Sequence, residues 1–367
     1  VVSQKGSYLG TGFATSNSKI RVRLISRNAN DRFDDAFFER RLRYAIDYRR
    51  TVMGEDFSNC RLIFGEADQF PGLTVDRFGD ILVAQVLSLG IEQRKGMLFA
   101  ALEKIFDELG EPLRGIYERN DVAIRELEGM EQYKGFYPLP DRPLPDSTTT
   151  TITENGITYA VDFENGQKTG FFLDQKYNRQ AVAKLSRGKR VLDCFTHTGS
   201  FGLNAAKGGA AYVLSVDISE SAIEMAQENA RRNGLEDRVE YLAENLFDML
   251  PTLSEPEMVP RNWQYDFIIL DPPAFTKSRQ TVESAARGYK EINLRAMRLL
   301  PRGGYLATCS CSHFMTESLF IKMLHQAAAD AGVSLRQIEA RQQSPDHPIL
   351  WNVEETNYLK FYLFQVV

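Results

Sequence analysis

Apolar and polar residues follow one another along the first 120 residues in short runs that predict strands and amphipathic helices. Strand-like runs cover residues 7–15 and 19–26, and apolar residues recur at helical spacing between 32 and 53. Further strands are expected at 62–64, 73–76, 81–87 and near 115–118, with a helix at 91–109. This order of elements predicts a small α+β domain.

Beyond residue 147 the pattern changes to strands and helices in alternation. Glu154-Asn155-Gly156 predicts a hairpin between 148–153 and 157–163. Strands are then expected at 190–194, 212–217, 239–242, 267–270, 305–310, 334–340 and 358–366, and helices at 200–207, 220–233, 285–300 and 316–332. The alternation predicts an α/β fold with a mostly parallel sheet, helices on both faces, and a ligand site at the carboxyl ends of the strands.

The chain is too long for one ordinary core, so we expect it to divide into 1–30, 31–147 and 148–367. Four prolines in 137–147 indicate a linker at the second boundary. Two strands cannot bury a core alone, so residues 1–30 are interpreted as the last part of a small β domain. Since the chain begins Val1-Val2 rather than Met, we expect N-terminal sequence to be missing.

Composition and charge exclude some classes of protein. The chain is 43% hydrophobic and 25% charged, as in a globular protein, and it has no apolar run long enough for a bilayer, so we expect neither a membrane span nor a signal peptide. Its four cysteines have no metal-type spacing, which favours a reducing cytoplasm. The net charge of −5 is unusual for a nucleic-acid enzyme, although residues 21–50 hold nine arginines against five acids. These arginines indicate either a phosphate-binding face or a solvated helix surface.

Two strand ends carry residues suited to a cofactor. Asp193 ends one strand and is followed by a glycine-bearing turn containing Phe195, Thr196, Thr198 and Gly199. This turn lacks both the dinucleotide glycine pattern and the lysine of a phosphate-binding loop, so those ligands are disfavoured. Asp217 ends the next strand, where a carboxylate can accept hydrogen bonds from ribose hydroxyls. The alternative for Asp217 is a helix N-cap.

A third strand end is followed by Asp271-Pro-Pro-Ala-Phe275. Two prolines after a buried strand fix a rigid turn, so the acid is held at the edge where cofactor and substrate meet. Together the three strand ends resemble the class I methyltransferase fold over roughly residues 150–367.

Cys311 is the candidate nucleophile, since it ends the strand that follows Asp271. Carbon 5 of a pyrimidine becomes nucleophilic only after a thiolate adds to carbon 6, so C5 methylation requires such a cysteine. The alternative is a small packing residue, which is the interpretation for Cys60, Cys194 and Cys309. His313 fits a base, an orienting group or an ordinary surface histidine equally well.

Several longer segments resemble the RlmI-type family of 23S rRNA cytosine-C5 methyltransferases. They are residues 64–77 (FGEADQFPGLTVDR), 166–175 (GQKTGFFLDQ) with Asn178 and Arg179, 193–199, 271–275, 287–293 (RGYKEIN), Cys311 within Ser-Cys-Ser, and 346–348 (DHP). The resemblance implies an N-terminal PUA domain, a central α+β domain and a C-terminal Rossmann-like methyltransferase domain.

The resemblance also implies roles for individual residues. Cys311 would be the nucleophile, and Asp271 would steady the base at N3. S-adenosylmethionine would be held by Gln175, the 193–199 loop, Asp217, Ile218, Asn245 and Asp271. Such enzymes often carry an acid where this chain has Asn245; the amide oxygen can still accept the adenine hydrogen bond, so we expect a weaker grip. Glu244 is a less suitable substitute.

The expected partner is 23S rRNA or a partly assembled large ribosomal subunit, with no membrane and with a homodimer compatible with the sequence. The target cytosine must be flipped or single-stranded. Binding should weaken steeply with salt, with Arg40, Arg41 and Arg43 contributing. Two alternatives stay open: a non-covalent adenine-N6 or guanine-N7 methyltransferase, and a catalytically silent RNA-binding protein.

Overall fold

The computed structural model describes residues 1–140, 142–253, 264–276 and 278–367. The chain packs as two compact units: unit 1 comprises 1–154, 160–174 and 345–356, and unit 2 comprises 155–159, 175–344 and 357–367. The division into 1–30, 31–147 and 148–367 stays a prediction. The units differ from it because residues 1–30 pack in unit 1 together with 31–147, as do three segments of the predicted C-terminal domain, 148–154, 160–174 and 345–356. Asp141 of the predicted linker lies outside the described residues.

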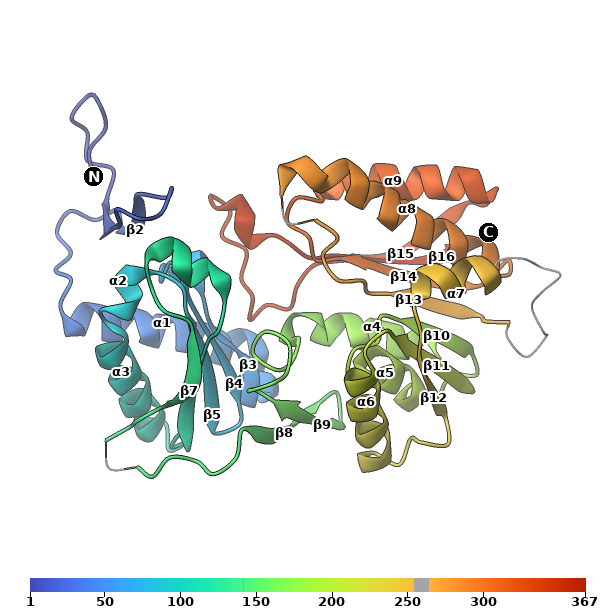
Figure 1. Ribbon diagram of the computed structural model, residues 1–367, viewed down its shortest axis with the longest axis horizontal. Helices are drawn as coiled ribbons and strands as arrows, with labels where there is room; N and C mark the ends of the chain where they lie inside the picture. The colour runs from blue at the N-terminus through green and yellow to red at the C-terminus, as the bar shows by residue number, and fades with distance from the viewer. Residues whose placement is uncertain (141, 254–263, 277) are drawn as a thin grey trace. The chain divides into compact units, whose positions relative to one another are not determined.

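The sheet of unit 2 has seven strands in the order β12-β11-β10-β13-β14-β16-β15 (Figure 1). Their bounds are β10 (Arg190–Cys194), β11 (Tyr212–Asp217), β12 (Val239–Ala243), β13 (Phe267–Leu270), β14 (Tyr305–Ser310), β15 (Leu335–Arg341) and β16 (Lys360–Val366). Strands β10 to β14 pair in parallel, whereas β16 is antiparallel to both of its neighbours. The mostly parallel sheet confirms the predicted α/β class.

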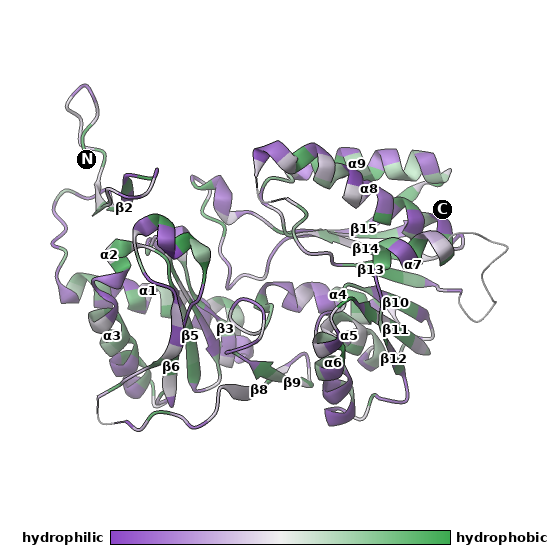
Figure 2. Ribbon diagram, in the orientation of Figure 1, coloured by the Kyte–Doolittle hydropathy of each residue, from purple (hydrophilic) through white to green (hydrophobic). Residues whose placement is uncertain are grey.

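Helices cover both faces of this sheet (Figure 1). One face carries α4 (Lys176–Leu185), α5 (Ser200–Lys207) and α6 (Glu220–Arg232), and the other carries α7 (Leu246–Leu253), α8 (Val282–Leu299) and α9 (Glu317–Ala331). The strands are hydrophobic along most of their length, while the outer faces of the helices are polar (Figure 2). Burying apolar surface between sheet and helices stabilises the unit.

Unit 1 is built on a five-stranded sheet in the order β3-β4-β5-β6-β7. Its strands are β3 (Asn59–Phe64), β4 (Leu73–Phe78), β5 (Ile81–Val86), β6 (Gly115–Asn120) and β7 (Tyr133–Tyr137), and the helices are α1 (Asp35–Met53), α2 (Leu89–Glu92) and α3 (Lys95–Glu108). The helix predicted at 91–109 is therefore two helices. Strands β1 (Thr11–Ala14) and β2 (Val22–Ser26) form a separate antiparallel pair.

The predicted hairpin consists of β8 (Thr149–Glu154) and β9 (Ile157–Asp162). Its two turn residues, Asn155 (φ 54°) and Gly156 (φ 72°), both have left-handed backbone. Two consecutive positive φ angles are what a tight two-residue turn between twisted strands requires, and Asn-Gly is the favoured pair. Within the described residues no helix is long and apolar enough to cross a membrane.

The interior of unit 1 contains a buried ionic network around Arg49. The Arg49 guanidinium is fully buried and makes a two-pronged contact with the Asp68 carboxylate at 2.5 and 2.8 Å. It also donates to the backbone oxygen of Asp346 at 2.9 Å. A buried charge is tolerated only when it is paired and hydrogen-bonded, and Arg49 meets that condition.

The same network joins three segments that are far apart in the sequence. Arg61 binds the Asp76 carboxylate at 2.7 and 2.8 Å, and Thr169 donates to the same carboxylate. The backbone N–H of Arg61 donates to the Asp346 carboxylate at 2.7 Å. Parts of the family-like segments 64–77, 166–175 and 346–348 therefore meet in a structural core.

Candidate active site

The loop that follows β10 has an unusual backbone. Phe195 (φ 64°) and His197 (φ 51°) are left-handed without being glycine, and Gly199 follows at φ 84°. A side chain at Gly199 would begin 3.0 Å from the Ala226 side chain and 3.2 Å from the Tyr241 hydroxyl, so the tight space and the left-handed backbone both favour glycine. Left-handed non-glycine residues cost about 1–3 kcal/mol each and persist where the surroundings fix them, often at functional sites.

Asp193 lies fully buried beneath this loop. Its Oδ2 accepts hydrogen bonds from the Thr196 hydroxyl, from the backbone N–H of Gly202 at 2.8 Å and from the Ser215 hydroxyl at 3.2 Å. Its Oδ1 is buried and has no hydrogen-bond partner among the described residues. Burial raises the Asp193 pKa to about 6 in spite of these hydrogen bonds. The carboxylate therefore gains from any ligand that brings a donor or a positive charge.

Asp193 makes the stability of the protein depend on pH. Its pKa is raised from the ordinary aspartate value to about 6 in the folded protein, so the folded state holds the proton more tightly. This tighter proton binding stabilises the folded state fully at pH values below the pKa of the unfolded state, and the stabilisation is lost as pH rises through the pKa of the folded state. In Asp193→Asn we expect urea unfolding to lose this dependence, which amounts to roughly 3 kcal/mol between the two values. An equal pH dependence of unfolding in Asp193→Asn and in the unsubstituted protein would contradict this role of Asp193.

Two further buried hydroxyls surround the loop, those of Thr198 and Tyr241. Neither has a hydrogen-bond partner among the described residues. Buried polar groups are normally hydrogen-bonded, so unpaired ones around a single loop indicate a place for a polar ligand. Together with Asp193 they fit a cofactor that carries both hydroxyl and cationic groups.

Asp217 at the end of β11 fixes the same loop from the neighbouring strand. Its carboxylate accepts from the backbone N–H of His197 at 2.9 Å and from that of Ser219 at 3.0 Å. The N-cap of α6 is Ser219, whose hydroxyl accepts from the backbone N–H of Ala222. Asp217 is therefore not the cap, and each of its oxygens retains a lone pair for ligand hydroxyls. Ile218 beside it is 72% exposed.

Asn245 lies at the start of α7. Its side-chain oxygen accepts from the backbone N–H of Phe247 at 3.1 Å, and its nitrogen donates to Asp248 at 2.7 Å. The amide therefore helps to cap the helix, and its oxygen keeps one lone pair for a further donor. The hydrogen bonds described for the Asn245 side chain join it to none of the other candidate residues, and the hydrocarbon side chain of Ile218 cannot form any.

An aromatic cluster lies beside the loop, and the sequence did not predict it. The ring of Phe275 is 6.5 Å from Phe195, 5.6 Å from Phe247 and 4.5 Å from Tyr289, measured between ring centres. Phe247 is 43% exposed, so the cluster has an open side. Aromatic faces of this kind stack on flat heterocycles. The signal available in the sequence was a phenylalanine shortly after each of three strand ends.

Gln175 and Asp271 are in direct contact. The Gln175 side chain is 3% exposed, and its Nε2 donates to Asp271 Oδ1 at 3.0 Å. Its Oε1 accepts from Asn178 Nδ2 at 2.6 Å, which fixes the orientation of the amide. Asp271 follows β13 and is thereby held in a defined position at the edge of the sheet.

Cys311 differs from the other three cysteines because it is partly exposed. It follows β14, whose Thr308 pairs with Leu270 of β13, so Cys311 and Asp271 leave neighbouring strands at the same edge. Burial raises the pKa of the Cys60, Cys194 and Cys309 thiols, which disfavours their reactive thiolate forms. His313 is exposed, and its ring packs against Phe314 at 5.4 Å.

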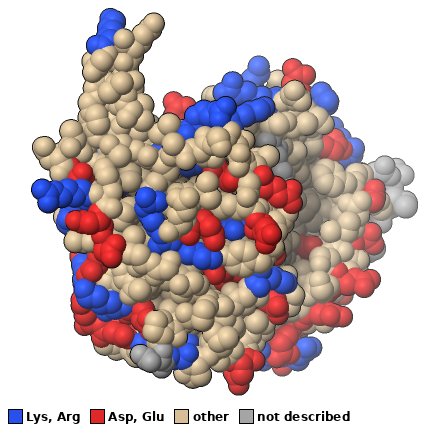
Figure 3. Space-filling view, turned by 60° about the vertical axis from the view of Figure 1, so that its left-hand side comes forward, with Lys and Arg blue, Asp and Glu red and all other residues tan. Residues whose placement is uncertain are grey.

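The arginines of α1 are mostly engaged within unit 1. Arg43 contacts Glu39 and Glu108, each at 2.7 Å, and Arg41 donates to the backbone oxygens of Ile25 and Gln69. Arg40 is exposed. Figure 3 shows basic and acidic side chains interspersed over the face it presents. Because Arg41 and Arg43 are engaged in these contacts, an ordinary solvated helix surface is favoured here over a continuous phosphate-binding face.

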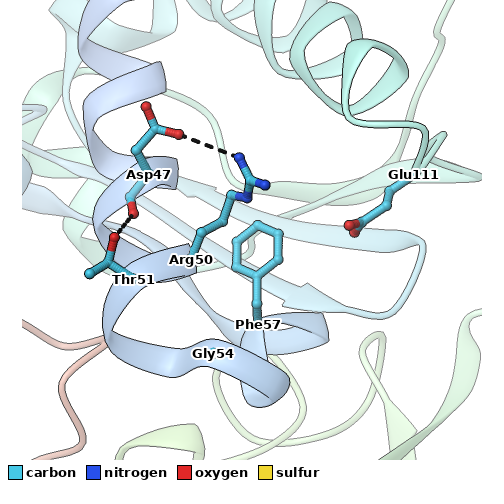
Figure 4. A pocket seen from close by; sticks show the side chains of 6 residues that line it. All are labelled: Asp47, Arg50, Thr51, Gly54, Phe57 and Glu111. Atoms are coloured by element: carbon cyan, nitrogen blue, oxygen red, sulfur yellow. Dashed lines mark hydrogen bonds and ion pairs between the residues drawn. The ribbon is translucent and has the colours of Figure 1, made fainter.

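A pocket of about 560 Å³ lies in unit 1 beside the end of α1 (Figure 4). Its lining includes Arg50 and Asp47, which are 3.8 Å apart and both exposed, so their pairing contributes little. None of the candidate site residues lines it.

In the described part of the chain no group of three His, Cys, Asp or Glu side chains could hold a metal ion.

Known proteins resemble this chain along its whole length. A family model for S-adenosylmethionine-dependent methyltransferases matches residues 141–365, and one for a PUA-like domain matches residues 1–27. Ribosomal RNA large subunit methyltransferase I of Escherichia coli O157:H7 is 38% identical, covering 100% of this chain and 90% of that protein. The protein of the same name from Aeromonas salmonicida is 40% identical, covering 98% of this chain and 88% of that protein.

Solved structures share the fold. A SAM-dependent methyltransferase from Streptococcus mutans superposes with a TM-score of 0.82 at 24% identity, covering 99% of this chain and 90% of that one. A second methyltransferase structure with the same TM-score of 0.82 was solved with SAH. At this level of identity the likeness shows the fold alone.

Proposed function

Since the chain belongs to the ribosomal RNA large subunit methyltransferase I family of S-adenosylmethionine-dependent methyltransferases, we propose that it forms 5-methylcytosine in 23S rRNA through a bond between Cys311 and the target base. One observation carries the proposal. Among the four cysteines, the partly exposed Cys311 follows the strand adjacent to the one that ends before Asp271. A thiol and a carboxylate at one edge of the sheet are what covalent activation of a cytosine needs.

The cofactor would be held along the carboxyl edge of the unit 2 sheet. The residues proposed to hold it are Gln175, Asp193, Phe195, Thr196, Thr198, Gly199, Asp217, Ile218, Asn245 and Asp271. S-adenosylmethionine supplies an electrophilic methyl group when it is bound. Asp193 and Asp217 would offer acceptors for its charged and hydroxyl groups, and the open side of the Phe195–Phe247–Phe275 cluster would accept its flat base.

The protein's own groups would act on the cytosine in a fixed order. The Cys311 thiolate adds to carbon 6, and the electron pair of the ring double bond makes carbon 5 nucleophilic. As negative charge develops at that edge of the ring, N3 takes a proton from water, and the Asp271 carboxylate, oriented by Gln175, accepts the hydrogen bond of the resulting N3–H. After methylation, loss of the carbon 5 proton to a base restores the double bond and expels the thiolate. The base must leave its stack to be reached.

A trapping experiment tests the covalent step. In an RNA fragment that contains 5-fluorocytosine, fluorine replaces the proton that must leave, so the adduct should survive denaturing electrophoresis. We expect Cys311→Ser to form no adduct and Cys309→Ser, the matched control two residues away, to form it. Methylated RNA without an adduct would instead favour adenine-N6 or guanine-N7 chemistry. Absence of cofactor binding by calorimetry would favour a silent RNA-binding protein.

Asp217 provides a separate test of the cofactor residues. We expect Asp217→Ala to weaken S-adenosylmethionine binding by about 10- to 100-fold, because a hydrogen bond to a charged group contributes about 1.5–3 kcal/mol. Calorimetry measures the effect. Glu220→Ala, an exposed acid three residues along, should leave the affinity unchanged. Equal affinities in the two variants would remove Asp217 from the site.

The larger setting of the reaction is also proposed. We expect the protein to act in the cytoplasm, on 23S rRNA or on a partly assembled large subunit. A homodimer stays a prediction. Comparing methylated cytosines in rRNA from cells with and without the gene would identify the nucleotide.

A further inference from the structure

Lys360 is a buried lysine beside the candidate nucleophile. It is 6% exposed, and its Nζ donates to the backbone oxygens of Ser312 at 2.7 Å and Tyr358 at 2.8 Å. Removing an ammonium from water is costly unless nearby groups compensate its charge. Two carbonyl oxygens provide part of that compensation, and they fix the ammonium in one place.

The register of the sheet puts this ammonium next to Cys311. Lys360 begins β16 and pairs with Ser310, the last residue of β14. The ammonium reaches Ser312, so it is anchored to the residue directly after Cys311. Burial lowers the Lys360 pKa to about 8, while charges on Cys311 and Glu317 raise it. The lysine therefore keeps its proton at neutral pH, and Cys311 is one of two groups that favour this.

The other titratable groups around the pair do not replace Lys360 as a cation. Glu317 of α9 accepts a hydrogen bond from the Tyr362 hydroxyl at 2.7 Å. Tyr289 of α8 faces Cys311, and burial raises its pKa, so it stays neutral. The Asp271 carboxylate is a negative group that raises the pKa of Cys309 and of Tyr289. Among these described groups Lys360 is the positive one.

We propose that Lys360 is a positioning residue that holds the Cys311 sulfur as the thiolate that attacks cytosine. The inference rests on the proposed function. The Cys311 thiol gives its proton to water, and the fixed ammonium stabilises the sulfur anion that remains. When sulfur bonds to carbon 6, the negative charge passes to the base and the ammonium keeps its proton. When the bond breaks, the ammonium stabilises the departing thiolate.

The proposal predicts the pH dependence of thiol alkylation in the protein without RNA or cofactor. Iodoacetamide labelling of Cys311 is followed by mass spectrometry, with Cys311→Ser giving the background from the three buried cysteines. We expect Lys360→Met to raise the midpoint of labelling by at least about one pH unit, because it removes a nearby cation. Lys360→Arg keeps the positive charge, so its labelling midpoint should stay close to that of the unsubstituted protein. An unchanged midpoint in folded Lys360→Met overturns the proposal.

A measurement on the unsubstituted protein covers the case in which Lys360→Met fails to fold. The ultraviolet absorbance of the thiolate, taken as the difference from Cys311→Ser, should titrate below the ordinary cysteine value of about 8.5. Titration at or above that value overturns the ion pair. The 5-fluorocytosine adduct reports separately on the covalent reaction. If the pKa of the Cys311 thiol is lowered but no adduct forms, the ion pair is supported and the proposed function is rejected. If an adduct forms but the pKa of the thiol is not lowered, the proposed function is supported and the ion pair is rejected.

Discussion

Cys311→Ser will lower the rate of cytosine methylation by more than about a thousandfold while leaving S-adenosylmethionine affinity within about twofold. A serine hydroxyl is a far weaker nucleophile than a thiolate at neutral pH, so carbon 6 is not attacked and carbon 5 stays inert. Single-turnover transfer of labelled methyl groups to a cytosine-containing rRNA fragment measures the rate, and calorimetry measures the affinity.

Cys309→Ser is the control for this substitution. Cys309 is fully buried, and burial raises the pKa of its thiol, so it is a poor nucleophile. We expect this variant to keep its rate within about tenfold, since a serine hydroxyl is similar in size and can keep the hydrogen bonds of the Cys309 thiol with Gln175 and Asp271. Full turnover in Cys311→Ser would mean that the methyl group goes to an atom that needs no covalent activation.

The second large effect concerns stability, and it comes from Arg49 in unit 1. We expect Arg49→Met to lower the free energy of unfolding by about 3–5 kcal/mol, because it leaves a buried partner charge unpaired. The side chains of Arg49 and Asp68 are 0% and 8% exposed. The Asp346 backbone oxygen also loses its donor. Urea unfolding followed by circular dichroism measures the loss.

Arg43→Met is the matched control on the same helix. Arg43 also pairs with carboxylates, those of Glu39 and Glu108, but its side chain is 36% exposed and theirs are 25% and 48% exposed. Water screens such pairs, so we expect a loss below about 1 kcal/mol. Similar losses in the two variants would show that burial does not decide the contribution of these arginines.

The sequence predicted the sheet of unit 2 better than its helices. The bounds of β10, β11, β13 and β14 agree with the predicted ranges, because largely buried strands appear in the sequence as short, mostly apolar runs. Helix α4 was not predicted. Its buried residues include Lys176, Asn178 and Arg179, so its inward face shows no apolar period. Helix α7 was also missed, since it has only eight residues and contains Pro251.

The candidate site could be predicted only where its residues lie at strand ends. Asp193, Asp217 and Asp271 were found in this way, since the carboxyl ends of parallel strands meet at one edge. The contact between Gln175 and Asp271 depends on pairing across the fold, which no local pattern encodes. The buried Lys360 was missed for the same reason. It became visible only when the structure placed β16 beside β14.

The position of β16 between β14 and β15 also has a consequence for protein synthesis. In the described sheet β15 pairs with β16 alone, although β15 comes first in the chain. On the ribosome, β14 and Cys311 emerge before β16, the strand that carries Lys360. Strand β15 also stays unpaired until β16 inserts. Until β16 inserts, a nascent chain carries Cys311 without the ammonium that would activate it. Its thiol is then an ordinary one with a pKa of about 8.5, and its reactivity towards oxidants and electrophiles would rise when folding is complete.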